Sequence, residues 1–249
     1  MKSVLITGCS SGFGLEIARY FQAHDWRVVA TMRTPRNDLL PPSDRLQLLA
    51  LDVTDPQSIR KAVEAAGPLD ALVNNAGFGA ASPAEVTPMA TVRGLFETNT
   101  FGTIAMTQAV VPQFRQRKSG VVVNVTSSVT LKALPLIAAY RASKAAVNAF
   151  TESMALELEP FGVRVRLVLP GRSLETRFAE NARPNMSGFD LEAYSGLVKQ
   201  VMSRLTDVSA PTTRAQDVAE AVWRAVTDPS CPTRIPAGAD AVAWMAEGQ

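Results

Sequence analysis

The chain has 249 residues, of which 47% are hydrophobic and 19% are charged. This length is close to the upper limit for one hydrophobic core, and this composition excludes an intrinsically disordered chain. The formal net charge of +2 is too small to indicate a nucleic-acid-binding surface. The densest basic group, Arg115, Arg117 and Lys118, stands where we expect a helix C-terminus, which favours positive charge.

Apolar and β-branched runs alternate along the chain with segments long enough for helices. The runs that we predict to be strands are 4–7, 27–30, 46–51, 71–73, 121–125 and 163–169. The segments that we predict to be helices are 14–24, 56–66, 89–117 and 138–159. Several runs are apolar throughout, which is typical of strands buried on both faces of a parallel sheet. The sequence therefore predicts an α/β fold with a doubly wound parallel sheet flanked by helices.

Cap and turn residues agree with these boundaries. Asp55 before Pro56 is typical of a helix N-cap followed by proline at the first helical position. The stretch 159–162, Glu-Pro-Phe-Gly, ends the long helix, and the stretch 35–44 reads as a loop. No linker or internal repeat divides the chain, so we expect a single domain over 1–249.

The cysteine and histidine content argues against two kinds of site. Cys9 and Cys231 lie far apart, and His24 is the only histidine, which disfavours a zinc site and a Ser-His-Asp triad. The N-terminus runs straight into a predicted strand without a cleavable signal segment, and no apolar run approaches the length of about 18 residues that spans a membrane. We expect a cytoplasmic protein with reduced thiols and no membrane span.

Three glycines, Gly8, Gly12 and Gly14, stand between the first predicted strand and the first predicted helix. Glycine is favoured where the backbone turns sharply or approaches a ligand, and the N-terminus of the helix that follows attracts phosphate. The spacing Gly-x-x-x-Gly-x-Gly differs from Gly-x-Gly-x-x-Gly but serves the same mechanism. An ordinary strand-to-helix turn is the alternative, and the position at the start of an α/β alternation favours phosphate binding.

Two further motifs follow predicted strands. Asp52 comes after the third strand, where an aspartate can accept a hydrogen bond from an adenine amino group; a simple turn residue is the alternative. Residues 74–77, Asn-Asn-Ala-Gly, end the fourth strand and can line a narrow cleft. Because the carboxyl ends of parallel strands share one edge of a sheet, we expect these residues to lie along the same ligand.

Tyr140 and Lys144 are four residues apart in a predicted helix, so their side chains share one face. A satisfied aromatic residue on a half-buried helix is the alternative. A free phenol has a pKa of about 10, which is too high for ready proton exchange at neutral pH. A neighbouring ammonium group favours the phenolate and lowers that pKa, so the pair is suited to general acid–base catalysis.

The motifs TGCSSGFG, NNAG, ETNTFG, NVTSS, YRASK and LPG occur in this order along the chain. Together they resemble the short-chain dehydrogenase/reductase family over essentially the whole chain, with a thinner match after residue 172. The resemblance implies a Rossmann-like fold and hydride transfer between a bound nicotinamide dinucleotide and a ketone or secondary alcohol. It also implies a small-molecule substrate, a homo-oligomer, and one domain that binds the cofactor and carries out catalysis.

By this resemblance Tyr140 is the general acid/base and Lys144 is its partner. Ser127 orients the substrate oxygen, and its spacing from Tyr140 favours it over Ser128. Asn99 anchors a water molecule of a proton relay. The cofactor-binding residues that the resemblance implies are Gly8, Ser11, Gly12, Phe13, Gly14, Arg33, Asp52, Val53, Asn75, Ala76, Gly77, Tyr140, Lys144, Pro170 and Gly171.

The loop after the sixth predicted strand departs from the family pattern Pro-Gly-x-x-x-Thr, whose threonine contacts the nicotinamide. The sequence PGRSLET puts Glu175 at the expected position and Thr176 one residue later. Either the loop bulges by one residue or Ser173 makes the contact. Arg172 can reach an anionic group or point to solvent, and we favour solvent.

The end of the second predicted strand indicates which dinucleotide binds. An acidic residue there accepts a hydrogen bond from the 2′-hydroxyl of NAD, and an arginine accommodates the 2′-phosphate of NADP. The chain has Met32 and Arg33 at this point, with Ser11 near the same corner. We predict that NADP(H) is preferred and that NAD(H) can also bind; a solvated loop charge is the alternative for Arg33.

An apolar stripe at helical spacing runs through the segment of about 173–210, which we predict to bind the substrate. Its members are Leu191, Tyr194, Leu197, Val198, Val201, Met202 and Leu205, with Phe178, Met186 and Phe189 upstream. We predict a mobile lid, which favours a substrate with an apolar body. A helix packed permanently on the core is the alternative.

Two other functions are weighed against a reductase. A nucleotide-sugar epimerase or dehydratase shares Tyr-x-x-x-Lys, but it has a Gly-x-x-Gly-x-x-Gly loop and a longer C-terminal substrate domain, which this sequence does not show. A non-catalytic, dinucleotide-binding regulatory protein usually lacks the tyrosine or the lysine. The sequence keeps both, which favours the enzyme.

Overall fold

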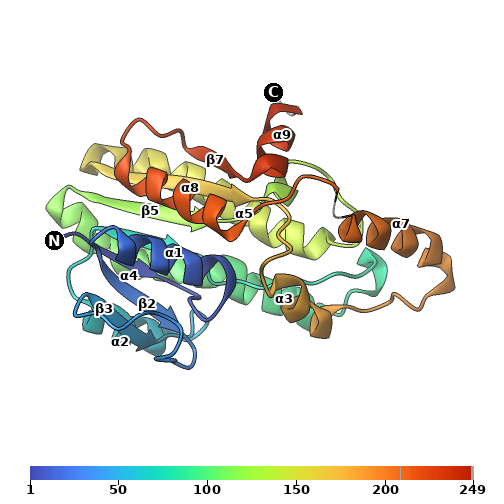
Figure 1. Cartoon of the computed structure of the whole chain (residues 1–249), viewed down its shortest axis with the longest axis horizontal. Helices are drawn as coiled ribbons and strands as arrows, with labels where there is room; N and C mark the ends of the chain where they lie inside the picture. The colour runs from blue at the N-terminus through green and yellow to red at the C-terminus, as the bar shows by residue number, and fades with distance from the viewer. Residues whose placement is uncertain (208, 248–249) are drawn as a thin grey trace.

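A parallel sheet forms the centre of the molecule (Figure 1). The computed structural model describes residues 1–207 and 209–247, and within them the strand order is β3-β2-β1-β4-β5-β6-β7. The strands are β1 (Ser3–Ile6), β2 (Arg27–Met32), β3 (Leu46–Ala50), β4 (Ala71–Asn74), β5 (Gly120–Val125), β6 (Val163–Pro170) and β7 (Arg234–Ala237). The order reverses between β1 and β4, the switch point at which doubly wound sheets bind ligands. The predicted fold class is confirmed.

All six predicted strands are present, with ends that differ by at most two residues from the prediction. The seventh, β7, was not predicted. It pairs with β6 at the edge of the sheet and contains Pro236, a residue that sheets tolerate at an edge strand. Four residues with a proline give too weak a pattern to be recognised as a strand.

Helices cover both faces of the sheet. The helices of the described residues are α1 (Gly12–Ala23), α2 (Pro56–Ala66), α3 (Met89–Leu95), α4 (Gly102–Arg117), α5 (Ala138–Leu158), α6 (Phe178–Ala182), α7 (Ser195–Thr206), α8 (Ala215–Thr227) and α9 (Ala239–Glu247), of which α6 and α7 lie apart from the sheet. Short 3₁₀ helices are Ala84–Val86, Ser128–Thr130, Glu159–Phe161, Arg183–Asn185 and Glu192–Tyr194. Because successive side chains of a strand point to opposite faces, the sheet has two cores. α1 and α8 pack with Val4 and Ile6 on one face, and α2, α4 and α5 pack with Leu5 on the other (Figure 1).

Local chemistry explains several helix boundaries. The Asp55 carboxylate accepts a hydrogen bond from the backbone N–H of Gln57 at 2.9 Å, so the predicted cap of α2 is confirmed. Gly162 follows the end of α5 with a φ of 66°, a left-handed conformation that glycine adopts without strain. The predicted helix 89–117 is divided, because a π-helical turn, Phe96–Phe101, separates α3 from α4. Such turns are frequent at functional sites.

The segment 173–207 differs from the rest of the chain. Neither α6 nor α7 contains a buried residue, and α7 lies at one end of the molecule, away from the sheet (Figure 1). Leu191, Met202 and Leu205 of the apolar stripe are 37%, 38% and 46% exposed. A helix packed permanently on the core would bury these side chains, so the structure does not support that alternative.

Three residues of the predicted ranges, Val208, Gly248 and Gln249, lie outside the described part of the chain. Cys9 and Cys231 are both buried free thiols. Within the described residues, no group of three or more His, Cys, Asp or Glu side chains is placed to hold a metal ion. None of the helices in that part of the chain combines the length and the apolar character needed to cross a bilayer.

Candidate active site

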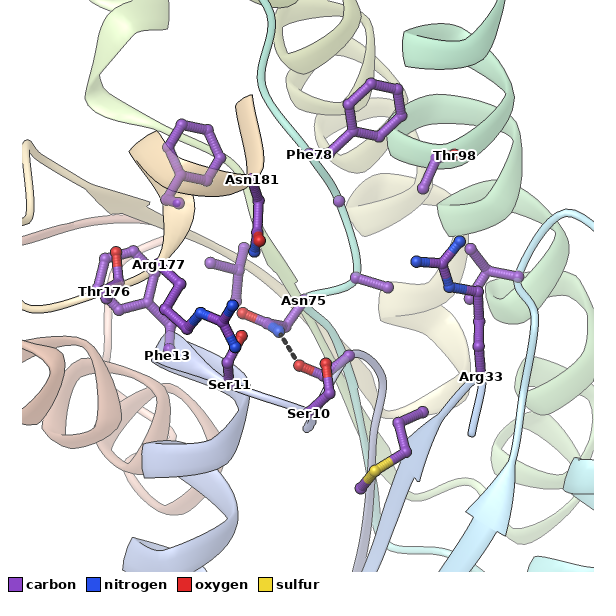
Figure 2. Close-up of a pocket in the computed structure, with 18 of the residues that line it drawn as sticks. Ser10, Ser11, Phe13, Arg33, Asn75, Phe78, Thr98, Thr176, Arg177 and Asn181 are labelled. Carbon is purple, nitrogen blue, oxygen red and sulfur yellow. Dashed lines mark hydrogen bonds between the residues drawn. The ribbon is translucent and has the colours of Figure 1, made fainter. Parts of the chain in front are cut away.

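A cavity of about 670 Å³ follows the carboxyl ends of the central strands (Figure 2). This volume is within the range of about 300–1,000 Å³ that is typical of ligand pockets. The predicted site residues that line it are Gly8, Ser11, Gly12, Phe13, Arg33, Asp52, Val53, Asn75, Ala76, Gly77, Tyr140 and Lys144. Five predicted residues, Gly14, Asn99, Ser127, Pro170 and Gly171, are not part of its lining. The cavity lies at the switch point of the sheet, as the sequence predicts.

The glycine loop requires glycine at two positions on the cavity wall. Gly8 and Gly12 have φ angles of 77° and 59°, in the left-handed region. A Cβ atom on Gly8 would lie 2.8 Å from the Cα of Ala76, so no larger residue fits between the loop and the end of β4. Ser11 is the N-cap of α1, yet its side chain makes no capping hydrogen bond. The N–H groups of the first turn of α1 therefore border the cavity without a side-chain cap.

Gly14 and Asn75 hold this loop in place. A Cβ atom on Gly14 would collide with the carbonyl oxygen of Gly8 and with the Asn75 side chain, so Gly14 allows close packing rather than facing the cavity. Nδ2 of Asn75 donates to the carbonyl oxygen of Thr7 at 2.9 Å. It also donates to the carbonyl oxygen of Gly8 at 3.2 Å (Figure 2). The Thr7 hydroxyl in turn accepts from the backbone N–H of Asn75 and of Ala76, each at 2.9 Å. These bonds join the ends of β1 and β4 across the switch point.

The strand ends of β2 and β3 provide charges at the opposite side of the glycine loop. Oδ1 of Asp52 accepts hydrogen bonds from the hydroxyl and the backbone N–H of Thr54, at 2.7 and 2.9 Å. These bonds lower the pKa of the Asp52 carboxyl, and the positive charge of Arg33 adds to the effect. Met32 is buried at the cavity floor with 3% exposure, whereas Arg33 is exposed. Arg33 extends from the end of β2 beside the cavity (Figure 2).

Tyr140 and Lys144 lie one turn apart on α5, and both are buried, with 7% and 6% exposure. Nζ of Lys144 donates to the carbonyl oxygen of Val125, at the end of β5, at 3.1 Å. Burial lowers the pKa of Lys144 to about 8. Burial also raises the pKa of Tyr140 to about 12, against the smaller lowering effect of a hydrogen bond to Ser127. The sequence predicts a lowered phenol pKa, whereas the net shift in the structure is upward because desolvation outweighs the effect of Ser127.

Ser127 follows β5 and starts a 3₁₀ helix, where its hydroxyl oxygen accepts from the N–H of Val129 at 3.3 Å. Ser127 is near enough to Tyr140 to lower the pKa of the phenol. Ser128, the alternative, is 1% exposed, against 7% for Ser127, and neither serine is part of the cavity lining. The structure therefore brings together Ser127, Tyr140 and Lys144 from β5 and α5.

Asn99 lies in the π-helical turn and faces the chain after β4. Its Oδ1 accepts from the N–H of Phe78 at 3.0 Å, and its Nδ2 donates to the carbonyl oxygen of Phe78 at 3.0 Å and to the Ser143 hydroxyl at 3.1 Å. A Cβ atom on Gly77 would lie 2.8 Å from Oδ1 of Asn99. Asn99 thus fixes the segment after Gly77 against α5. Its role in anchoring a water molecule stays a prediction.

Pro170 and Gly171 end β6 behind the cavity wall. A Cβ atom on Gly171 would collide with the Asp240 carboxylate, and the N–H of Gly171 donates to the Thr213 hydroxyl at 3.0 Å. Thr213 also donates to Oδ1 of Asp240 at 2.7 Å. This buried group ties the end of β6 to the chain before α8 and to α9, which explains why neither residue lines the cavity.

The guanidinium group of Arg172 is held by backbone carbonyl groups and does not point to solvent, so the favoured interpretation of this residue is wrong. Its Nη1 donates to the carbonyl oxygens of Arg204 and Leu205 at 3.0 and 2.7 Å, and its Nη2 donates to that of Asp207 at 2.7 Å. These carbonyl groups end α7 and have no partner within the helix. Arg172 therefore caps the C-terminus of α7, where positive charge is favoured. A contact with residues so far along the chain leaves no local pattern.

The loop that departs from the family pattern turns Thr176 toward the cavity. Oε2 of Glu175 accepts from the N–H of Ala215 at 3.1 Å, so Glu175 is directed to the start of α8. Thr176 lines the cavity, and a Cβ atom on Gly12 would lie 3.4 Å from its Cβ. The hydroxyl oxygens of Ser173 and Thr176 are buried and have no hydrogen-bond partner among the described residues. Of the two, Thr176 lines the cavity and is free to contact a ligand there.

Several lining residues were not predicted from the sequence. They include Ser10, Arg36, Thr54, Thr98, Arg177 and Asn181. Ser10 stands within the glycine motif, and its position was a signal that could have identified it. Arg177 and Asn181 belong to the segment 173–207, whose approach to the cavity depends on tertiary contacts and cannot be inferred from local spacing.

Comparisons with known proteins agree with this geometry. The family model for short chain dehydrogenase matches residues 2–187. The uncharacterized oxidoreductase YusZ of Bacillus subtilis is 36% identical over 91% of this chain and 85% of that protein, and retinol dehydrogenase 8 of Bos taurus is 32% identical over 94% and 80%. A short chain dehydrogenase from Burkholderia cenocepacia, solved in complex with NADP, has a TM-score of 0.78 and 26% identity, over 100% of this chain and 94% of that one. The chain therefore belongs to the short-chain dehydrogenase family of oxidoreductases.

Proposed function

We propose that the protein is an NADP(H)-preferring oxidoreductase that transfers hydride between the nicotinamide of its cofactor and a ketone or secondary alcohol with an apolar body. One observation carries the proposal. Tyr140 and Lys144 lie on the wall of a cavity that also holds the glycine loop, and Ser127 is near enough to Tyr140 to lower the pKa of the phenol. Proton-transfer groups and a phosphate-binding loop thus share one space.

The residues present suit a nicotinamide dinucleotide. The N–H groups at the start of α1 lack a side-chain cap and would hold the pyrophosphate. The buried hydroxyl oxygens of Ser173 and Thr176 would bond the carboxamide of the nicotinamide, because buried polar groups are nearly always hydrogen-bonded. We assign to the cofactor site Gly8, Ser11, Gly12, Phe13, Arg33, Asp52, Val53, Asn75, Ala76, Gly77, Tyr140 and Lys144, with Gly14, Pro170 and Gly171 shaping it from behind.

The proposed catalytic residues transfer the proton that accompanies hydride transfer. The bound cofactor supplies or accepts the hydride. Tyr140 gives a proton to the substrate oxygen in ketone reduction and removes it in alcohol oxidation. Ser127 donates a hydrogen bond to the same oxygen and stabilises the charge that develops there. Lys144 stays charged at neutral pH, since its pKa is about 8, and this charge favours loss of the phenolic proton.

The end of β2 supports the preference for NADP(H). Arg33 borders the cavity and can pair with a 2′-phosphate. Met32 offers no carboxylate to accept a hydrogen bond from the 2′-hydroxyl of NAD. Ser11 lines the same cavity and adds a hydroxyl group. NAD(H) fits the remaining contacts, which do not involve the 2′ position.

An apolar substrate body is supported by the segment 173–207. The ring of Phe178 lies 5.7 Å from the ring of Tyr140, centroid to centroid, so an apolar side chain borders the catalytic hydroxyl. Leu174 and Phe178 are 53% and 41% exposed, which leaves apolar surface for a ligand to cover. The relative retinol dehydrogenase 8 is named for an apolar alcohol. We propose that this segment is a lid over the substrate.

The test is turnover of a panel of ketones, from sugars to aliphatic and polycyclic compounds, with NADPH or NADH consumption followed by absorbance. We expect turnover of the apolar ketones with NADPH, and its loss in Tyr140→Phe. Dinucleotide binding without turnover of any ketone or alcohol would support a regulatory protein. Conversion of a nucleotide sugar without net consumption of the cofactor would support an epimerase.

A further inference from the structure

Two arginines that the sequence motifs do not include, Arg36 and Arg177, line the same cavity as the glycine loop. Arg36 comes from the loop after β2, and Arg177 comes from the start of the segment 173–207. Arg177 extends over Ser11, across the cavity from Arg33 (Figure 2). Positively charged side chains from two distant parts of the chain therefore border the same cavity.

Each of these two arginines is paired with an acid of its own segment. Nη2 of Arg36 lies 2.7 Å from Oδ2 of Asp38, and Nε of Arg177 lies 2.9 Å from Oε2 of Glu180. The side chains of Arg177 and Glu180 are 62% and 59% exposed. Exposed pairs of this kind contribute little free energy, so a more strongly charged partner can replace the carboxylate.

Arg36 and Arg177 are close enough for their charges to repel. The hydrogen bond and the charge of Asp38 raise the pKa of Arg36, and the positive charge of Arg177 acts in the opposite direction. Within the described residues, the hydrogen bonds of the two guanidinium groups go to Asp38 and Glu180, so neither arginine joins separate elements of the fold. An anion between them would remove the repulsion and satisfy both.

We propose that Arg177 and Arg36 bind the 2′-phosphate of NADP(H) from two sides of the cavity, in addition to Arg33. This inference rests on the proposed cofactor preference and deepens it. Arg177 exchanges Glu180 for the phosphate, because arginine–phosphate contacts are charge-assisted and can be bidentate. The segment 173–207 is thereby fastened to the cofactor. NADP(H) favours its closed position more than NAD(H) does, since only NADP(H) offers the additional contact.

The test measures the dissociation constants of NADPH and NADH for wild type and Arg177→Gln by titration calorimetry. We expect NADPH binding to weaken at least about fivefold, because an exposed hydrogen bond to a charged group is lost, and NADH binding to change less than about twofold. Arg183→Gln is the matched control. It removes the same charge from the same segment but outside the cavity lining, and it should leave both constants within about twofold.

Glu180→Gln separates ligand binding from a structural role of the ion pair. If Glu180 competes with the phosphate for Arg177, this variant should bind NADPH about two- to fivefold more tightly and leave NADH binding unchanged. A structural ion pair predicts weaker binding in both Arg177→Gln and Glu180→Gln. Weaker NADPH binding in both variants therefore overturns the proposal.

Hydrogen exchange gives a readout that does not depend on affinity. In the wild type, NADPH should slow amide exchange in residues 177–182 more than saturating NADH does, and in Arg177→Gln the two cofactors should have equal effects. Equal weakening of NADPH and NADH by Arg177→Gln would point to the shared pyrophosphate and overturn the assignment. Equal affinities of the wild type for both cofactors would contradict the proposed preference for NADP(H). The role of Arg177 is tested separately, by the change in NADPH affinity that Arg177→Gln causes.

Discussion

The two sides of the cavity are built differently. On the side of the glycine loop, β1, β4 and β5 are buried over their whole lengths, and Asn75 fixes the loops through hydrogen bonds to the backbone. On the side of the segment 173–207, α6 and α7 bury no residue, and Arg177 pairs with a carboxylate of its own short helix. The first side is buried and joins segments that are distant in sequence. The second side is exposed and has few ties to the rest of the chain, such as the hydrogen bond from the N–H of Ser187 to the carbonyl oxygen of Ala81 at 3.2 Å.

This difference indicates which part of the site is built before a ligand arrives. Buried regions with satisfied hydrogen bonds open only at a large free-energy cost, whereas exposed segments with few apolar contacts open at a small one. Enzymes draw their moving parts from the second kind. We therefore expect the side of the glycine loop to be fixed by the fold and the side of the segment 173–207 to adjust when a ligand binds.

The largest expected effect comes from the fixed side. Tyr140→Phe removes the proton donor and keeps the ring, so kcat should fall by roughly 10²–10⁴-fold, the usual range for general acid–base catalysis. NADPH affinity should stay near that of the wild type. Steady-state kinetics and a binding titration measure the two effects. A variant that keeps more than about a third of kcat on every substrate would contradict the catalytic assignment.

The same substitution on the two sides should have unequal effects on stability. Leu72 in β4 is 0% exposed and Leu205 in α7 is 46% exposed. Leu72→Ala should lower the free energy of unfolding by about 2–5 kcal/mol, because it leaves a cavity in the core. Leu205→Ala should change it by about 0.5 kcal/mol or less. Denaturant unfolding measures both values, and similar losses would contradict the contrast between the two sides.

The fixed side should also respond to pH through Lys144. Its pKa falls from 10.5 to about 8 on folding because of burial, so between these values the unfolded chain binds more protons. Stability should therefore rise with pH from 8 to 10, by about 2–3 kcal/mol relative to Lys144→Met. Above pH 10, Tyr140, whose pKa is raised to about 12, acts in the opposite direction. Parallel curves for wild type and Lys144→Met over this range would exclude a buried, desolvated Lys144.

Cofactor preference should depend on the end of β2. A hydrogen bond to a charged group is worth roughly 1.5–3 kcal/mol, so kcat/KM with NADPH should exceed that with NADH by at least about tenfold. Arg33→Ala should remove most of this difference, and Met32→Asp should reverse it. Kinetics with both cofactors measure the ratio. Equal efficiencies in the wild type would rule out the preference.

The smallest expected effect concerns movement on the adjustable side. Amide exchange in residues 173–207 should slow when a substrate joins the bound cofactor, and exchange in β4 and β5 should not change. Hydrogen exchange followed by mass spectrometry resolves these segments. Equal protection of 173–207 with and without substrate would count against a lid.

Much of the fixed side could be predicted because its signals are local. Strands of a parallel sheet carry long apolar runs. The motifs around Gly8 and Asn75 follow the ends of such strands, and the motif around Tyr140 lies within one helix. The prediction of a shared ligand edge needed only the rule for carboxyl ends of strands. The single domain over 1–249, the homo-oligomer and the cytoplasmic location stay predictions.

The rest depends on tertiary packing, which leaves no local signal. The contact of Arg172 with Leu205 and the place of Arg177 on the cavity lining depend on how the segment 173–207 folds back. The direction of the Tyr140 pKa was wrong because burial follows from the whole fold, whereas the presence of Lys144 one turn away can be read from spacing. The strand β7 was missed because pairing with β6, rather than its own composition, makes it a strand.

Both ends of the segment 173–207 meet at Arg172. Its backbone N–H donates to Oδ2 of Asp240 at 2.6 Å, and its guanidinium group holds the carbonyl oxygens of Leu205 and Asp207. The ends of the segment are therefore held together at Arg172, and in its middle the N–H of Ser187 donates to the carbonyl oxygen of Ala81. Between these ties the length and sequence of the segment can change without displacing β6 or α8. Because the entropy of closing a loop grows slowly with length, such changes cost little stability. We expect such changes to alter the substrates that enzymes of this fold accept, as long as the proposed cofactor contacts of Ser173, Thr176 and Arg177 are kept.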